Sequence, residues 1–322
     1  MTQIDETAKG EGLELARRMA EEEEGIGRRP KGWTRYIIPA VAAAWSLFQL
    51  SIASFWVLDS TYTRAIHLAF AMVIVFLNYP TLKKARFGLK FLSATNRIPI
   101  PDFIIAVLAG ISALYIAIDY EGITMRYGMP NTRDIVMGLT LTILLLEAAR
   151  RVIGPALSVI AGLFIFYAFM GPYMPDLIAF KGVSLNRFVG QMTMSTEGIY
   201  GIPLDVSATI VFLFVLFGAM LDRAGAGQYF IRLALSLLGG FKGGPAKAAI
   251  MGSGLTGLVS GSSIANIVTT GTFTIPLMKK VGYPAKKAAA VEVAASTDGQ
   301  LAPPIMGAAA FIIAEYVNVP YV

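Results

Sequence analysis

Residues 248–278 read AAIMGSGLTGLVSGSSIANIVTTGTFTIPLM, a stretch of 31 residues without a charged side chain. Lysines flank it on both sides, at Lys242 and Lys247 before it and at Lys279, Lys280, Lys286 and Lys287 after it. Because bases beside apolar segments resist translocation, these flanks favour an even number of crossings or an entry and return. Two arms of about 15 residues would each be roughly 22 Å long, short of a ~30 Å hydrocarbon core. The stretch therefore predicts a re-entrant helical hairpin over 248–278, with its turn near residues 260–263.

The segment that follows, 288–319, is apolar but interrupted twice. The interruptions are Ser296, Thr297, Asp298, Gly299 and Gln300, followed by Pro303 and Pro304. Consecutive prolines remove two backbone donors and clash with the preceding turn, so a continuous helix through them is excluded. We expect one broken span here.

Six further apolar stretches precede the hairpin, and together they define the fold class. They cover residues 37–58, 65–79, 103–118, 135–146, 155–170 and 206–221. A full crossing needs about 20 mainly apolar residues, so the shorter stretches include flanking polar residues, and 135–146 is the weakest span. Lys and Arg alternate between rich and poor loops, which places the N-terminus in the cytoplasm. We predict an all-α, polytopic membrane protein with about seven spans, one re-entrant helical hairpin and a broken helix.

Composition agrees with a membrane protein and excludes several kinds of chemistry. Of the 322 residues, 55% are hydrophobic and 15% charged, whereas soluble domains have about 45–50% apolar and about 25% charged residues. With no Cys and a single His, disulfides, thiolate nucleophiles and Cys-ligated metals are excluded. No phosphate-binding loop is present, so we expect no enzyme activity. The net charge of +6 is explained by membrane topology, so the lipid bilayer and not nucleic acid is the expected partner.

The two interruptions lie close in sequence and form the candidate site. Broken helices expose carbonyl oxygens that suit a small cation and amides that suit a carboxylate. Na⁺ prefers oxygen ligands, which carbonyls and five side chains offer here: Ser260, Ser262, Ser263, Asn266 and Thr297. Close packing of small residues, as in the spacing of Gly257 and Gly261, is the alternative explanation of the Gly and Ser residues. Asp298 and Glu292 belong either to the site or to a water-facing surface.

Two other ionisable residues have simpler interpretations. His67 fits an interfacial or packed residue better than a proton relay. Glu147, beside Arg150 and Arg151, predicts an ion pair at a helix end.

Several of these motifs resemble one family. They are Gly252, Ser253 and Gly254 leading into 260–266, then 276–278 with 282–284, and finally Gly299 with Pro303 and Pro304. In this order they resemble the first half of the large membrane subunit of a TRAP (tripartite ATP-independent periplasmic) transporter. The four spans before residue 150 resemble the small membrane subunit fused ahead of it, similar to the fused permeases that work with TAXI-type binding proteins.

The resemblance implies that the chain is divided into four parts. Residues 1–36 would be a polar cytoplasmic lead-in and 37–152 a four-helix, small-subunit-like region. Residues 153–205 would hold a connecting helix and a periplasmic amphipathic segment. Residues 206–322 would be the first part of the transport domain, which contains the hairpin 248–278 and the broken helix 288–319.

The resemblance also implies a function. It is Na⁺-driven import of organic acids such as dicarboxylates by an elevator movement in the bacterial inner membrane. The expected partner is a periplasmic solute-binding protein, Na⁺ is the coupling ion, and no cofactor is expected. Carried over by position, the substrate and ion site would comprise Ser260, Gly261, Ser262, Ser263, Asn266, Thr297, Asp298, Gly299, Pro303 and Pro304. Ser260, Ser262, Ser263, Asn266 and Gly299 would hold Na⁺.

The large subunit of the family is an inverted repeat, and its second repeat would follow residue 322. We therefore expect the chain to be an N-terminal half that needs the missing C-terminal half as a partner. Two other functions fit the same pattern. One is a channel lined by the hairpin and broken helix, which could not accumulate a solute against its gradient. The other is a membrane scaffold that transports nothing.

Overall fold

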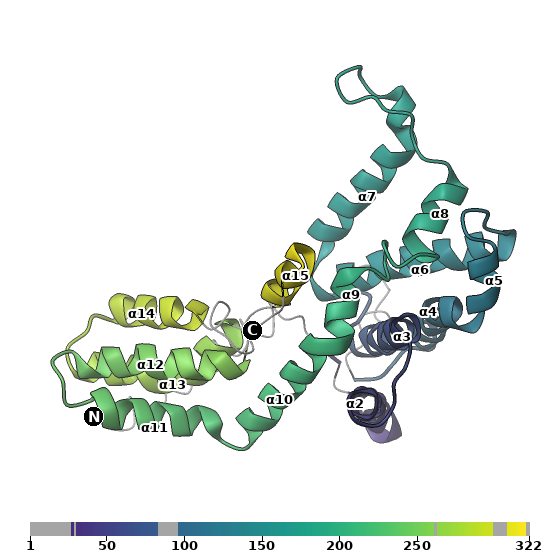
Figure 1. Cartoon of the computed structure of the whole chain (residues 1–322). Helices are drawn as coiled ribbons and strands as arrows, with labels where there is room; N and C mark the ends of the chain where they lie inside the picture. Colours follow the sequence, from purple (N-terminus) through teal and green to yellow (C-terminus); the bar gives the residue numbers. More distant parts are fainter. Residues whose placement is uncertain (1–26, 29, 83–95, 261–262, 299–307, 320–322) are drawn as a thin grey trace. The chain divides into compact units, whose positions relative to one another are not determined.

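The structure, a computed structural model, describes residues 27–28, 30–82, 96–260, 263–298 and 308–319, and the regular elements within these ranges are all helical (Figure 1). Five of the described helices are long and apolar enough to cross a membrane. They are Gly32–Ser54, Ser60–Asn78, Ile100–Ile118, Pro155–Tyr173 and Ile202–Leu221. These helices confirm the prediction of an all-α, polytopic membrane protein.

The weakest predicted span, 135–146, lies within α6 (Thr132–Val152). This helix is not among the five, because Arg133 and Asp134 at its start and Glu147, Arg150 and Arg151 at its end make it less apolar. The exact number of spans therefore stays a prediction.

The chain divides into two compact units, of which the first comprises Glu23–Ala208. Its helices are η1 (Gly32–Tyr36), α2 (Ile37–Ser54), α3 (Ser60–Asn78), α4 (Ile100–Ile118), α5 (Tyr120–Met125), α6, α7 (Pro155–Met170), η2 (Gly171–Tyr173), α8 (Leu185–Thr193) and α9 (Ile202–Val206). Side chains at the ends fix where several begin. Asp59 accepts a hydrogen bond from the Thr61 amide at 2.8 Å, and Asn131 forms a reciprocal capping box with Asp134.

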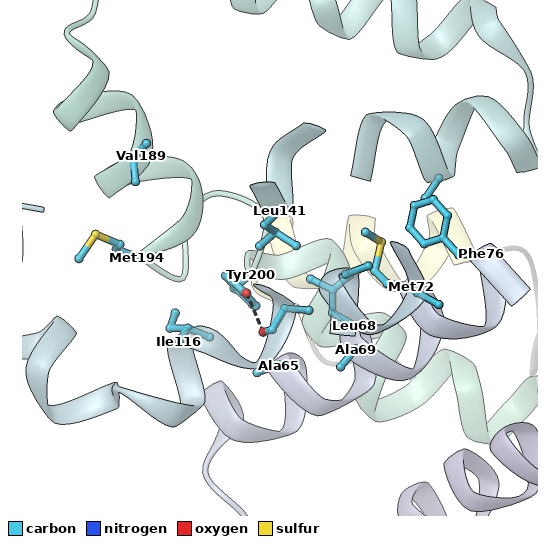
Figure 2. Packing of buried hydrophobic residues seen from close by; sticks show 14 of the residues in the cluster. Ala65, Leu68, Ala69, Met72, Phe76, Ile116, Leu141, Val189, Met194 and Tyr200 are labelled. Atoms are coloured by element: carbon cyan, nitrogen blue, oxygen red, sulfur yellow. Dashed lines mark hydrogen bonds between the residues drawn. The ribbon is translucent and has the colours of Figure 1, made fainter. Parts of the chain in front are cut away.

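The core of the first unit forms where α3 and α4 pack closely (Figure 2). Small residues line this contact: Ala65, Ala69, Ala106, Ala109, Gly110 and Ala113. A Cβ atom at Gly110 would lie 3.0 Å from Val73 Cγ2, so the two backbones approach as small residues allow in membrane helices. Tyr200, fully buried beside them, donates its hydroxyl to the Ala113 carbonyl at 2.8 Å.

A buried charge network closes one end of this core. Asp102, which is fully buried, accepts hydrogen bonds from Arg28 and, at 2.9 Å, from Arg151. Arg28 Nη1 also donates to the carbonyls of Phe76 and Leu77, and Arg151 Nη1 donates to the carbonyl of Tyr79, all near the end of α3. Cations at the carbonyl end of a helix satisfy groups that have no partner within the helix.

Glu147 pairs with Arg150 at 2.7 Å and with Arg151 at 2.8 Å, which confirms the predicted helix-end ion pair. In the loop between α5 and α6, Arg126 donates to Asp134 and Asp119, and these hydrogen bonds raise the pKa of its guanidinium.

The single histidine is a packed residue, as expected. His67 is buried on α3, where its ring contacts the side chains of Trp45 and Gln49 on α2. Its Nε2 atom lies 3.1 Å from the Ser207 hydroxyl, at the start of the π-helical turn η3 (Ser207–Val211).

The second unit contains the predicted hairpin. Its described helices within Thr209–Val322 are α10 (Phe212–Arg223), α11 (Ala226–Leu238), α12 (Gly244–Ser260), α13 (Ser263–Lys280), α14 (Ala285–Asp298) and α15 (Ala308–Val317). Helices α12, α13 and α14 pack against one another, and α11 lies along α12 (Figure 1). The predicted hairpin is thus a pair of packed helices, α12 and α13. Its turn at 261–262 lies outside the described residues, and its re-entrant placement stays a prediction.

The first three residues of the predicted interruption, 296–298, are helical. Helix α14 continues through Ser296 and Thr297 to Asp298, and α15 begins at Ala308. Both hydroxyls bond one turn back, since Ser296 donates to Glu292 at 3.3 Å and Thr297 to the Val293 carbonyl at 2.8 Å. Polar residues of this kind are accommodated within a helix by such bonds. The residues between, 299–307, lie outside the described part of the chain.

Candidate ion and substrate site

The structure describes five of the ten predicted site residues. Ser260 ends α12, the partly buried Ser263 begins α13, and Asn266 is fully buried on α13. Thr297 and Asp298 are exposed at the end of α14, so neither side chain joins Asn266. The other five, Gly261, Ser262, Gly299, Pro303 and Pro304, lie outside the described residues.

Asn266 is held in place by one side of its amide. Its Nδ2 atom donates to the carbonyl and the hydroxyl of Ser253 on α12, at 2.8 and 3.0 Å. Its Oδ1 atom is buried without a hydrogen-bond partner. A buried polar atom without a partner is unfavourable, so this oxygen is a candidate ligand for a cation.

Next to Asn266 lies a buried group of hydroxyls around a carboxylate, here called the hydroxyl cluster. It consists of Ser253, Thr270, Thr274, Glu292 and Ser296, all of which are fully buried. Thr270 and Thr274 of α13 donate to the two carboxylate oxygens of Glu292 on α14. The Ser253 and Ser296 hydroxyls lie 3.0 Å apart and join α12 to the same group. The cluster therefore connects all three packed helices.

Gly271 allows α13 and α14 to approach each other closely at this cluster. A Cβ atom at Gly271 of α13 would lie 3.3 Å from Glu292 Cγ and 3.3 Å from Ile275 Cδ1. These distances are tighter than ordinary contacts, so the absent side chain lets α14 bring Glu292 close to the threonines.

The sequence predicted Asn266 as a site residue and did not decide whether Glu292 belongs to the site or to a water-facing surface. It did not predict Ser253, Thr270, Thr274 or Ser296 as site residues. One pattern was available. Asn266, Thr270 and Thr274 recur every four residues, as do Glu292 and Ser296, so each set lies along one face of its helix.

A pocket of about 320 Å³ lies beside the cluster in the same unit. It is lined by Gln228, Ile231, Arg232, Leu235, Ala248, Ala249, Phe273, Thr274 and Leu277. The lining is mainly apolar, and Thr274 belongs both to the pocket wall and to the hydroxyl cluster.

The five long apolar helices, together with a polar group buried among α12, α13 and α14, define a multi-span, α-helical membrane protein with a polar internal site. Buried polar groups of this kind mark ion and substrate pathways. Residues 140–322, more than half of the chain, match the family described as "Tripartite ATP-independent periplasmic transporter, DctM component". The chain belongs to this family, and the predicted resemblance to TRAP permeases is confirmed.

Several curated proteins are similar to it. The C4-dicarboxylate TRAP transporter large permease protein DctM of Vibrio cholerae is 34% identical over 106 residues, 33% of this chain and 23% of that protein. The isethionate TRAP transporter permease protein DctMQ of Oleidesulfovibrio alaskensis is 28% identical over 218 residues, 64% of this chain and 32% of that protein. The ectoine TRAP transporter large permease protein TeaC of Halomonas elongata is 29% identical over 119 residues, 37% of this chain and 28% of that protein.

The chain thus spans about a quarter to a third of the length of these relatives. The match to the isethionate permease covers more of the chain than residues 140–322 hold, so it reaches into the segment before residue 140. No solved structure matches the chain.

Proposed function

We propose that the chain is part of the membrane permease of a Na⁺-coupled, binding-protein-dependent secondary transporter that imports organic acids by an elevator movement. Family membership supports a transporter permease and not an enzyme. C4-dicarboxylate appears in the names of relatives from three organisms, which supports an organic-acid substrate of dicarboxylate type. Relatives named for isethionate and ectoine set the alternatives to be tested.

The observation that carries the Na⁺ proposal is the buried, unpartnered Oδ1 atom of Asn266. It lies one turn from the start of α13, where the hairpin turn is expected to supply carbonyls. We propose that Asn266 completes a Na⁺ site with Ser260, Ser262, Ser263 and Gly299. The proposed substrate region adds Gly261, Thr297, Asp298, Pro303 and Pro304.

The proposed partners follow from the family. They are a periplasmic solute-binding protein, the organic-acid substrate, the remaining large-subunit half of the permease, and the lipid of the bacterial inner membrane, with the N-terminus in the cytoplasm. Within the chain, 37–152 would serve as the small-subunit-like region, 153–205 as the connection and 206–322 as the transport part.

The test is Asn266→Ala in cells that express the whole permease with its binding protein. We expect the Na⁺ concentration for half-maximal uptake to rise at least about tenfold, as for the loss of one supporting ligand, with unchanged protein in the membrane. The matched control is Asn186→Ala, which removes an exposed amide on α8. Uptake that keeps its Na⁺ dependence in Asn266→Ala would refute the site. Failure to accumulate solute against its gradient would instead indicate the channel alternative.

A further inference from the structure

Glu292 is an unusual residue for the interior of a helical membrane protein. It is fully buried, and its Oε1 atom accepts from Thr270 and, at 3.3 Å, from Ser296, while its Oε2 atom accepts from Thr274. No Lys or Arg of the described residues forms an ion pair with it. An ionised carboxylate buried without a counter-charge is strongly unfavourable, so this group needs a positive charge at some stage.

The elements packed against Glu292 do not supply that charge. Helices α12 and α13 pack against α14, and α11 packs against both of these. Their titratable and charged side chains, together with those of α14 itself and the turn before it, are Tyr229, Arg232, Lys247, Lys279, Lys280, Tyr283, Lys286, Lys287 and Asp298. Tyr283 is partly buried, and the others are exposed at the surface. Among the described residues of these helices, none supplies the positive charge, and a bound cation or proton would supply it.

The hydrogen bonds around Glu292 suit a proton. Each threonine hydroxyl carries one hydrogen, and each has a second acceptor on its own helix. Thr270 Oγ1 lies 2.8 Å from the Asn266 carbonyl, and Thr274 Oγ1 lies 3.0 Å from the Thr270 carbonyl. When the carboxylate is ionised, both hydroxyls donate to it. When it is protonated, its O–H donates to Thr274, whose hydrogen turns to the Thr270 carbonyl, so the carboxyl keeps its partners in both states.

A metal cation at Glu292 would require a larger rearrangement than a proton. A Na⁺ ion would need the lone pairs of the surrounding oxygens, so all three hydroxyls would have to turn their hydrogens away from the carboxylate, whereas a proton requires only Thr274 to turn. The unpartnered Asn266 Oδ1 is a separate atom, and among the described residues no hydrogen bond joins Glu292 to Asn266.

The pocket of about 320 Å³ gives a proton a short route. Its wall includes Thr274, and the exposed side chains of Gln228 and Arg232 also line it. A proton delivered from the pocket to Thr274 Oγ1 lets the hydrogen already on that hydroxyl pass to Glu292 Oε2. One O–H bond forms on Thr274 Oγ1 with the incoming proton, the original O–H bond on that oxygen breaks, and one O–H bond forms on Glu292 Oε2. The carboxylate thus gains one proton and the hydroxyl is unchanged.

We propose that Glu292 is a reversible proton-binding site, reached from this pocket through Thr274 and distinct from the proposed Na⁺ site. Binding one proton removes the formal charge of the hydroxyl cluster, so the net charge inside the packed helices depends on pH. This inference goes beyond the proposed function, because it concerns proton binding by the chain itself and requires no transport.

The experiment is infrared difference spectroscopy of the purified chain in lipid, titrated with acid and base at constant Na⁺. We expect a carboxylic-acid C=O band that appears on acidification and is lost in Glu292→Gln. The matched control Glu315→Gln changes an exposed carboxylate on α15 and should keep the band. Thr274→Val, which removes the hydroxyl that hydrogen-bonds Glu292 Oε2, should shift the midpoint of the titration.

Three results would overturn the proposal. One is a titrating band that is the same in Glu292→Gln and in the unmodified chain. Another is loss of the band on adding NaCl at fixed pH, which would make the carboxylate a Na⁺ ligand. If Glu292→Gln does not elute as a folded protein in gel filtration, Thr274→Val decides, and an unchanged midpoint refutes the assignment.

Discussion

Asp102→Ala is the substitution to which the first unit should be most sensitive. The carboxylate of Asp102 and the guanidinium of Arg28 are both fully buried, and the Arg151 side chain is 1% exposed. Removing the acid leaves two buried cations without their shared anion. Loss of one partner of a buried ion pair costs about 3–5 kcal/mol.

The value for Asp102 should lie near the lower end of that range. Arg151 keeps its bond to Glu147 at 2.8 Å, and Arg28 keeps the Phe76 and Leu77 carbonyls at 3.1 Å each. We therefore expect about 3 kcal/mol, which for a unit of this size corresponds to a fall in Tm of roughly 6–12 °C.

Tryptophan emission during heating in detergent measures the Tm of the first unit. The three tryptophans, Trp33, Trp45 and Trp56, all lie in the first unit, so their emission reports the unfolding of that unit. The control is Asp176→Ala, which removes an exposed carboxylate. Adding Arg151→Met to Asp102→Ala should restore part of the lost Tm, because one of the two buried cations that shared Asp102 is then removed. A Tm for Asp102→Ala within about 2 °C of the control, or no recovery in the double variant, would refute the reasoning.

Two further substitutions test the packing of the same unit. Gly138→Ala should destabilise it by about 1–3 kcal/mol, because the new Cβ atom would lie 2.5 Å from Thr193 Oγ1 and 2.7 Å from Val189 Cγ1. Gly162→Ala, where nothing lies within 4 Å, is the control and should be neutral or stabilising in the same melting assay. Tyr200→Phe should lower stability by about 1 kcal/mol through loss of the 2.8 Å bond to the Ala113 carbonyl, and an unchanged Tm would contradict that value.

The local signals in the sequence predicted most helices well. The span 155–170 agrees with α7 at both ends, because Gly154 and Pro155 together define a helix start. Helix α11 was not predicted. Its 13 residues are too few for a span, and the polar residues Gln228, Arg232 and Ser236 interrupt its apolar sequence. At Ser296 and Thr297, bonds to residues one turn back kept the helix intact where small polar residues suggested an interruption.

The candidate site was less accessible to sequence reasoning. Asn266 is conspicuous as an amide within an apolar stretch. Ser253, Thr270 and Thr274 are not, because hydroxyls in membrane helices usually bond their own backbone, and the sequence of one helix does not show which face meets the next. Glu292 was left open for the same reason. Its burial depends on Gly271 and on the register between α13 and α14, which no local pattern specifies.

Two carbonyls just after the end of α3 accept hydrogen bonds from arginines of α6, which are synthesised much later. The carbonyls of Tyr79 and Thr81 receive donors from Arg151 and Arg150, which are 72 and 69 residues further along the chain. Until these arginines have been synthesised, Arg28 is the only one of the two guanidinium groups that can pair with Asp102, and the carbonyls of Tyr79 and Thr81 lack these donors. The hydrogen bonds around Asp102 and after the end of α3 can therefore be completed only once α6 has been synthesised.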